Sequence, residues 1–329
     1  TSESPYTSNS AQFQDTITLR KEITMRKIVI FNSTIALLLV AGLASAQNED
    51  VTFFVIGKHA NFSQQITGER IPIDYSFFSE VFMTADGNAD NASLTLPTGE
   101  RIEFEDMRDA KDGSRDNILL VAGEDRFARL SDLQARYPDG KFSVSFDTPS
   151  GDPDAVVLEF DNRGLPTPPK ISISQAGKSN CVGLLPGGDA VIHWDAFEEG
   201  RVDPHGILDD LIFVILTDAR GNRVAHSGRP LEGTPYLSFA AQSHVIDGGS
   251  LQPDQNYTLS VEHAMLDDTA RFDNVPAFTT RAATTKLEIS SFASSADKAE
   301  CSTSQAMPTL DSQVTMLYYN NFDAAVQFY

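Results

Sequence analysis

Short apolar runs broken by turn residues are the feature that most limits what this chain can fold into. No stretch of the sequence keeps the spacing of a long amphipathic helix. The breaks contain Gly, Pro, Asp and Asn, as in Asp86-Gly87-Asn88 and Pro138-Asp139-Gly140. Hydrophobic residues make up 41% of the chain, enough for a packed core. We therefore predict an all-β protein, with strands at 51–56, 77–84, 92–96, 101–105, 141–147, 155–160, 170–174, 189–194, 211–217, 223–225, 236–239, 257–264, 277–280 and 285–289.

The segment Gly164-Leu165-Pro166-Thr167-Pro168-Pro169 is the best candidate for a domain boundary. Its prolines stiffen the chain and cannot donate hydrogen bonds to a sheet. The strand pattern stops before it and restarts after it. We predict an N-terminal β-sandwich at 47–163, a linker at 164–169 and a second β-sandwich at 170–292. One short helix is expected at Ser131–Arg136, capped by Ser131 and stopped by Pro138.

The second half resembles a fibronectin type III domain. Ala190-Val191-Ile192-His193-Trp194 looks like the strand of that family that contains the core Trp. Leu251-Gln252-Pro253, followed by Tyr257 and alternating apolar residues, looks like its tyrosine corner. The resemblance covers about residues 168–290 and implies a fibronectin III-like sandwich there, with an insertion near Glu198–Ile207. With the strand pattern of the first half, we expect two tandem immunoglobulin-like or fibronectin III-like sandwiches. In the first half, Leu130 and Leu133 are followed by Tyr137-Pro138-Asp139-Gly140-Lys141-Phe142-Ser143-Val144. This stretch is similar to segments of exported bacterial proteins that pair two β-sandwiches, a likeness that implies no activity.

A secretory signal peptide is predicted at residues 25–46. Met25-Arg26-Lys27 is basic, Ile28–Leu43 is apolar, and Ala44-Ser45-Ala46 fits signal peptidase, so cleavage is expected between Ala46 and Gln47. The alternative is a membrane anchor, but about 16 apolar residues fall short of the roughly 20 that span a bilayer. Residues 1–24 are interpreted as an over-extended reading frame. The mature protein is expected to be secreted or periplasmic with no stable membrane span, and the structure of 293–329 is left open.

The charge balance excludes some partners. The chain has 46 Asp and Glu against 25 Lys and Arg, a formal charge of −21. Nucleic acids and anionic membrane surfaces are bound mainly through Lys and Arg, so neither is an expected partner. A protein or glycan of the cell envelope remains the expected partner.

One acidic loop is a weak candidate for calcium. Asp86, Asn88 and Asp90 stand at positions 1, 3 and 5 of a loop, and Ca²⁺ prefers such oxygen ligands. Position 12, where a Glu would complete the site, is Pro97. A solvated acidic hairpin is the alternative. No other cofactor is expected.

The two cysteines, Cys181 and Cys301, are a disulfide candidate because disulfides form in exported proteins. Two free thiols are the alternative.

Motifs of known enzymes are missing from the sequence. The six histidines form no zinc-binding spacing, and no nucleophile elbow, phosphate loop or dinucleotide fingerprint occurs. His193 and His263 are expected to be outward-facing or hydrogen-bonded strand residues. A metal or catalytic role for Asp203, His205, Asp209 and Asp210 is a minor alternative. We predict a non-catalytic binding or structural protein; the alternative is a polysaccharide-active hydrolase or lyase, or its accessory binding chain.

Overall fold

The computed structural model describes residues 50–84, 87–106, 118–121, 126–149, 155–176, 178–179, 181, 183–231, 235–272 and 274–292, with 118–121 and 178 as backbone only. All of them belong to one compact unit that begins at Ala44. The predicted reading-frame extension, signal peptide and cleavage site, and the segment 293–329, lie outside the described residues. The described residues contain no helix that is both long and apolar enough to cross a bilayer.

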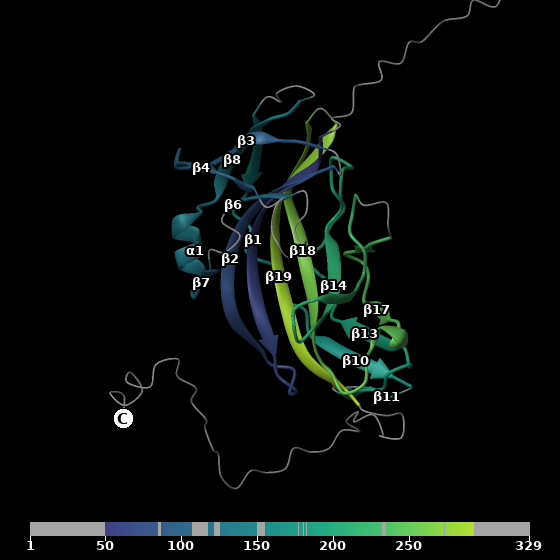
Figure 1. Ribbon diagram of the computed structural model, residues 1–329. Coiled ribbons are helices and arrows are strands. Elements are labelled where there is room, and N and C mark those ends of the chain that lie inside the picture. Colours follow the sequence, from purple (N-terminus) through teal and green to yellow (C-terminus); the bar gives the residue numbers. More distant parts are fainter. Residues whose placement is uncertain are drawn as a thin grey trace, which may run out of the picture. The chain divides into compact units, whose positions relative to one another are not determined.

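The protein is all-β, as predicted, and is built around one large sheet (Figure 1). The strand order is β15-β14-β18-β19-β1-β2-β6-β5, with β12, β16 and β7 pairing at its sides. The bounds are β1 Val51–Gln64, β2 Arg70–Met83, β5 Glu105–Asp106, β6 Ile118–Val121, β7 Arg126–Phe127, β12 Gly183–Leu184, β14 Leu211–Asp218, β15 Arg223–His226, β16 Leu237–Ser238, β18 Asn256–Phe272 and β19 Val275–Ser291.

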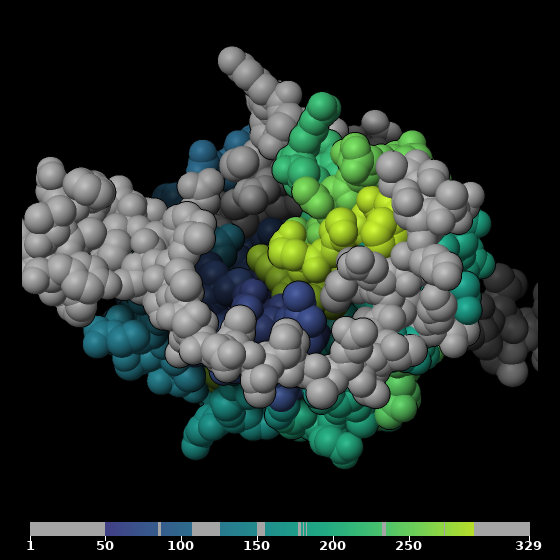
Figure 2. Space-filling view, turned by 90° about the horizontal axis from the view of Figure 1, so that it is seen from below, coloured from purple at the N-terminus to yellow at the C-terminus, as the bar shows by residue number. Residues whose placement is uncertain are grey.

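The main sheet joins the two halves of the sequence. β1 pairs in parallel with β19, from Phe54 opposite Ala277 to Ser63 opposite Lys286. Seen from below, β19 (yellow) lies beside β1 and β2 (purple) in Figure 2. A continuous sheet therefore contains strands from both sides of the predicted linker, a connection that the sequence did not predict.

Two small sheets pack on the same face of the main sheet, called here the inner face. The first has the order β4-β3-β8-β9 and the second β11-β10-β13-β17. In β19, Val275 and Ala277 belong to the core under the first sheet, and Leu287 and Ile289 to the core under the second. All four have odd numbers in one regular strand, so they point to the same side. The bounds are β3 Asp90–Thr95, β4 Arg101–Glu103, β8 Gly140–Asp147, β9 Val156–Phe160, β10 Ile171–Gln175, β11 Lys178–Ser179, β13 Ala190–Trp194 and β17 Ser243–Ile246.

The second core confirms the placement of Trp194 and Tyr257. Trp194 is buried, and its indole Nε1 donates to the carbonyl of Ala241 at 2.9 Å. The Tyr257 ring is buried as well, and its hydroxyl accepts the backbone N–H of Gln252 at 2.7 Å. The hydroxyl thus reaches the chain five residues upstream, as a tyrosine corner does.

The predicted helix exists, but its cap was wrong. α1 spans Leu130–Arg136, and its N-cap residue is Arg129, without a side-chain cap bond. Arg129 pairs with Asp132 at 2.9 Å, while Ser131 lies inside the first turn. A single-turn helix η1, Gly248–Ser250, also forms.

Buried charges occupy the inner face between the two cores. Arg281 of β19 and Lys58 of β1 are each 1–2% exposed. The Arg281 Nε lies 2.5 Å from an oxygen of Asp267, whose other oxygen lies 2.6 Å from Arg163 Nη2. Lys58 Nζ and Arg281 Nη2 both contact Asp139. These ion pairs compensate the buried charges and link strands of both halves.

Candidate functional site

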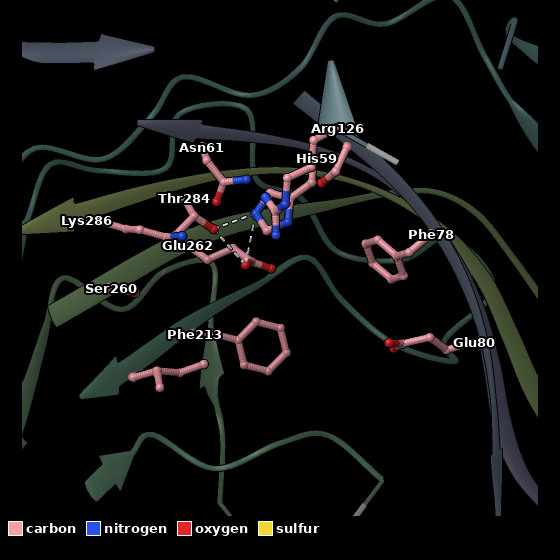
Figure 3. A pocket seen from close by; sticks show the side chains of 12 residues that line it. His59, Asn61, Phe78, Glu80, Arg126, Phe213, Ser260, Glu262, Thr284 and Lys286 are labelled. Atoms are coloured by element: carbon pink, nitrogen blue, oxygen red, sulfur yellow. Dashed lines mark hydrogen bonds and ion pairs between the residues drawn. The ribbon is translucent and has the colours of Figure 1, made fainter. Parts of the chain in front are cut away.

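A groove lies on the opposite face of the main sheet, called here the outer face. It consists of two adjoining pockets of about 360 and 280 Å³, which share the residues Phe78, Glu80, Phe213, Ile215 and Glu262. Their volumes fall in the range of small-ligand sites. Figure 3 shows the first pocket, with the rings of Phe78 and Phe213 drawn beside and below the group of His59, Thr284 and Glu262.

A single row of side chains crosses five strands to form the polar part of this groove. Phe213 of β14 stands opposite Glu262 of β18, which stands opposite Thr284 of β19. Thr284 stands opposite Asn61 of β1, and Asn61 opposite Asp74 of β2. Directly opposed residues in a sheet have side chains within contact distance. The row is therefore assembled by strand register, from segments far apart in the sequence.

His59, from the neighbouring register position of β1, contacts Thr284 and Glu262 of this row (Figure 3). The Thr284 hydroxyl donates to Glu262 Oε2 at 2.8 Å. His59 Nε2 lies 2.5 Å from the Thr284 hydroxyl oxygen and 3.3 Å from Glu262 Oε2. Burial acts to raise the pKa of Glu262, but the charge of His59 and the hydrogen bonds from His59 and Thr284 outweigh it, so the pKa is lowered. Glu262 is therefore an ionised acceptor at neutral pH.

This arrangement differs from a nucleophile relay. In such a relay one ring nitrogen of His takes the hydroxyl proton and the other is held by a carboxylate. Here the same nitrogen, Nε2, faces both groups, and the Thr284 proton points to Glu262 directly. The geometry suits the binding of a hydroxyl-bearing ligand, because it sets a fixed acceptor beside an imidazole ring.

Gly57 shapes the wall of the groove. It stands opposite Phe78, and a Cβ atom at Gly57 would lie only 2.2 Å from the Phe78 ring. The missing side chain therefore allows the ring to lie over β1. Beyond Phe78 the groove becomes aromatic: Phe53 stacks on Phe82 at 4.2 Å between ring centroids and on Phe278 at 5.8 Å.

Charges of both signs line the polar end. Arg126 of β7 pairs with Asp74 at 3.0 Å, and the same carboxylate accepts the Asn61 amide at 2.7 Å. Lys286 has no ion-pair partner among the residues that the structure describes. Arg126 and Lys286 supply donors and Glu80 and Glu262 supply acceptors, so the groove offers both kinds of group.

The predicted calcium and disulfide residues lie away from the groove. Asp86 lies outside the described residues; Asn88 donates its amide to Asp90 at 3.2 Å. No group of three His, Cys, Asp or Glu side chains within the described ranges is placed to hold a metal ion. Cys181 is buried in the second core, and Cys301 lies outside the described residues. The calcium site and the disulfide both stay predictions.

The acidic cluster of the predicted insertion organises a loop. Asp203 accepts the backbone N–H groups of His205, Ile207 and Leu208 and the hydroxyl of Thr269. Asp210 accepts the N–H of Leu266 at 2.7 Å and of Arg201 at 3.0 Å. These contacts explain the cluster as a structural one, holding the loop against β18.

Asp210 should make stability depend on pH. Burial raises its pKa from 3.8 to about 6, opposed by the hydrogen bonds from Leu266 and Arg201. Well below pH 3.8 the carboxyl is protonated in both the folded and the unfolded chain, and between pH 3.8 and about 6 only the folded chain keeps the proton. As the pH rises through 6, the fold loses up to about 3 kcal/mol of stability, since one pKa unit corresponds to roughly 1.4 kcal/mol.

Asp210→Asn removes this titration. We therefore expect the stability advantage of the wild type over Asp210→Asn to shrink between pH 4 and pH 7, measured by urea unfolding at each pH. A constant difference over that range would contradict the assignment.

The two strand histidines behave differently. His193 is exposed and contacts the Ser174 hydroxyl at 3.1 Å. His263 is buried, stacks on Phe197 at 4.4 Å between ring centroids, and contacts the Thr167 carbonyl at 3.1 Å. Both fit the predicted alternatives of an outward-facing or a hydrogen-bonded residue.

The sequence did not single out any groove residue as functional. His59 and Thr284 are 225 positions apart, and nothing in the spacing of either indicates the other. The polar residues at alternate positions of β1 were the available signal, but they look like an ordinary solvated strand face.

Comparisons with known proteins add likenesses at the level of fold. No family model matches the chain, and the search of curated proteins gives no match. Among solved structures, the chain is similar to the BSP domain of a biofilm associated protein, with 12% identity and a TM-score of 0.18 over 70% of this chain and 28% of that one. It thus spans under a third of that chain.

Two further solved structures are similar. One is the chicken CNTN1 FN1-FN3 domains, with 11% identity and a TM-score of 0.24 over 72% of this chain and 66% of that chain. The other is murine CEACAM1b, with 7% identity and a TM-score of 0.20 over 73% of this chain and all of that chain. These values are too low to carry an argument about function.

Proposed function

We propose that this chain is an exported, non-catalytic binding protein that holds a segment of an envelope glycan in the outer-face groove. The observation that carries the proposal is the row of polar side chains Glu262–Thr284–Asn61, which lines one pocket together with His59 and the rings of Phe78 and Phe213. Export rests on the signal peptide of residues 25–46, and implies a secreted or periplasmic protein with its N-terminus at Gln47.

The chemistry of the groove favours a saccharide. Sugar hydroxyls both donate and accept hydrogen bonds, and the groove offers an ionised acceptor, Glu262, beside the donors Asn61 and Lys286. The rings of Phe78 and Phe213 can pack on the apolar faces of sugar rings. Glu80 and Glu262 together disfavour a strongly anionic ligand.

A second candidate is a polysaccharide hydrolase. The observation that favours it is that two carboxylates, Glu80 and Glu262, line the same groove, because glycoside hydrolysis uses a pair of carboxyl groups. The low pKa of Glu262 suits a nucleophile or base but not the protonated acid.

A glycan panel tests the proposal. We expect the protein to retain oligosaccharides of at least one class without changing them. Phe213→Ala and Glu262→Gln should each weaken binding about tenfold or more, because residues at the centre of a binding site carry most of its energy. Titration calorimetry measures the loss, and a thermal melt of each variant checks its folding.

Tyr236→Ala and Glu103→Gln are matched controls, since both residues are exposed and outside the lining of the groove. Neither should change binding. Retention that survives Phe213→Ala would place the binding site elsewhere. If no glycan is retained, the proposal that the ligand is a saccharide is contradicted. Turnover that Glu262→Gln abolishes would favour the hydrolase.

A further inference from the structure

Lys58 and Asp139 make an unusually short contact on the inner face. The Lys58 Nζ lies 2.5 Å from Asp139 Oδ1, although the residues are 81 positions apart. Lys58 belongs to β1, in the main sheet, and Asp139 immediately precedes β8, in the first small sheet. Lys58 is 1% exposed, whereas Lys141 and Lys170 are exposed. An amine and a carboxyl group from the two layers of the sandwich are thus held together.

The surroundings of Lys58 disfavour its charge. Burial lowers the pKa of the amine, against the opposing effects of the hydrogen bond and the charge of Asp139. The ring centroids of Phe160 and Phe142 lie 4.6 and 6.0 Å from Nζ. Arg281, a second cation, adds to the lowering. The Lys58 amine therefore loses its proton more readily than a surface lysine does, and the neutral amine is the nucleophilic form.

The carboxyl group of Asp139 is also held in position. The Arg281 Nη2 lies 3.1 Å from the same oxygen, Oδ1, that contacts Lys58. Arg281 is itself fixed by Asp267, through Nε at 2.5 Å. A guanidinium at this place can stabilise negative charge that develops on the carboxyl oxygen. The site combines a nucleophile, an electrophilic carboxyl and a donor for the oxyanion, already oriented by the fold.

We propose that Lys58 and Asp139 condense to an intramolecular isopeptide bond between Nζ and Cγ. A proton first passes from Nζ to the carboxylate across the short contact. The freed lone pair of Nζ attacks Cγ, and the oxyanion is stabilised by Arg281. The C–N bond forms as one C–O bond breaks, and the departing oxygen leaves as water with two of the three hydrogens of the ammonium group. No oxidant, reductant or cofactor takes part.

The water released by the condensation can reach solvent. The Asp139 side chain is 30% exposed and lines an open pocket with Gly140 and Glu159. The other buried cation of the network, Arg281, cannot react in the same way, because a guanidinium stays protonated. The bond would tie β1 to the start of β8 and lock the two layers of the first sandwich, independently of any ligand in the groove.

Intact mass spectrometry of the reduced, denatured full chain tests this proposal without any variant. We expect a mass lower by one water than that calculated for the observed N-terminus. A protease digest should give one branched peptide that joins the segments containing Lys58 and Asp139. A wild-type mass equal to the calculated one would overturn the proposal, as would a water loss located outside this peptide.

Two variants and a matched control sharpen the test. Lys58→Arg keeps the positive charge and Asp139→Ala removes the carboxyl group; both should restore the full calculated mass. Lys170→Arg, at an exposed lysine, should keep the loss of one water. If Lys58→Arg still lacked the water, the bond would not involve Lys58 and the proposal would be wrong. A variant that fails to fold can still be compared with its calculated mass, because the mass is measured after denaturation.

Discussion

Replacing Asp267 with alanine should lower the free energy of unfolding by about 3–5 kcal/mol, because it removes the buried carboxylate that compensates the buried guanidinium of Arg281. The Asp267 side chain is fully buried and contacts both Arg281 and Arg163. Burial raises its pKa, and the charges of both arginines oppose that effect. Urea unfolding of the variant and the wild type measures the change.

Asp132→Ala is the control for this experiment. Asp132 also pairs with an arginine, Arg129, but at the surface, where such a pair contributes about 1 kcal/mol or less. We expect a small change in the control and a large one in Asp267→Ala. Equal small changes would show that the inner-face ion pairs do not hold the fold together.

Trp194→Ala should cost about 3–5 kcal/mol, as truncations of buried aromatic residues do. The ring belongs to the second core, and its removal leaves the Ala241 carbonyl without the indole N–H that donates to it. Domains are stable by only about 5–15 kcal/mol, so the second half is expected to unfold at moderate urea concentrations in this variant.

Trp194 is the one tryptophan of the chain, so its fluorescence reports its own surroundings. The folded wild type should emit as a buried indole and shift to longer wavelength on unfolding. Tyr236→Ala, at an exposed aromatic residue, should change stability little. Emission typical of an exposed indole in the native wild type would contradict the placement of Trp194.

The inner and outer faces of the main sheet have different roles. The inner face carries both cores and the ion pairs between them, which are tested by unfolding. The outer face carries the groove, which is tested by binding. Successive side chains of a strand point to opposite faces, so the neighbours Lys58 and His59 lie on different faces and are tested by different measurements.

Local sequence signals predicted the parts of the fold that depend on short-range chemistry. Alternation and turn residues indicated the all-β class and most strand positions. Pro138 marked the end of α1, which spans Leu130–Arg136. The pattern around Trp194 and Tyr257 placed one ring in the core and one hydroxyl on the backbone.

Strand lengths were predicted poorly where buried charges interrupt the apolar pattern. β19 was expected as two strands, 277–280 and 285–289, yet Val275–Ser291 is continuous. The gap between the expected strands begins at Arg281, which looks like a surface residue in sequence. β1 was similarly expected to end at Ile56, before Lys58, but runs to Gln64. Each charge is buried only because a partner from a distant segment compensates it.

The sequence by itself therefore determined most strand-forming segments and the turns, since each depends on neighbouring residues. Only the tertiary structure decided that β1 and β19 pair, that Lys58 meets Asp139, and that His59 meets Thr284 and Glu262. These contacts join residues 81 to 225 positions apart, and register across the sheet selects them. A polar residue in a strand shows the same local pattern whether it faces solvent, a groove or a buried partner, so no local rule could distinguish them.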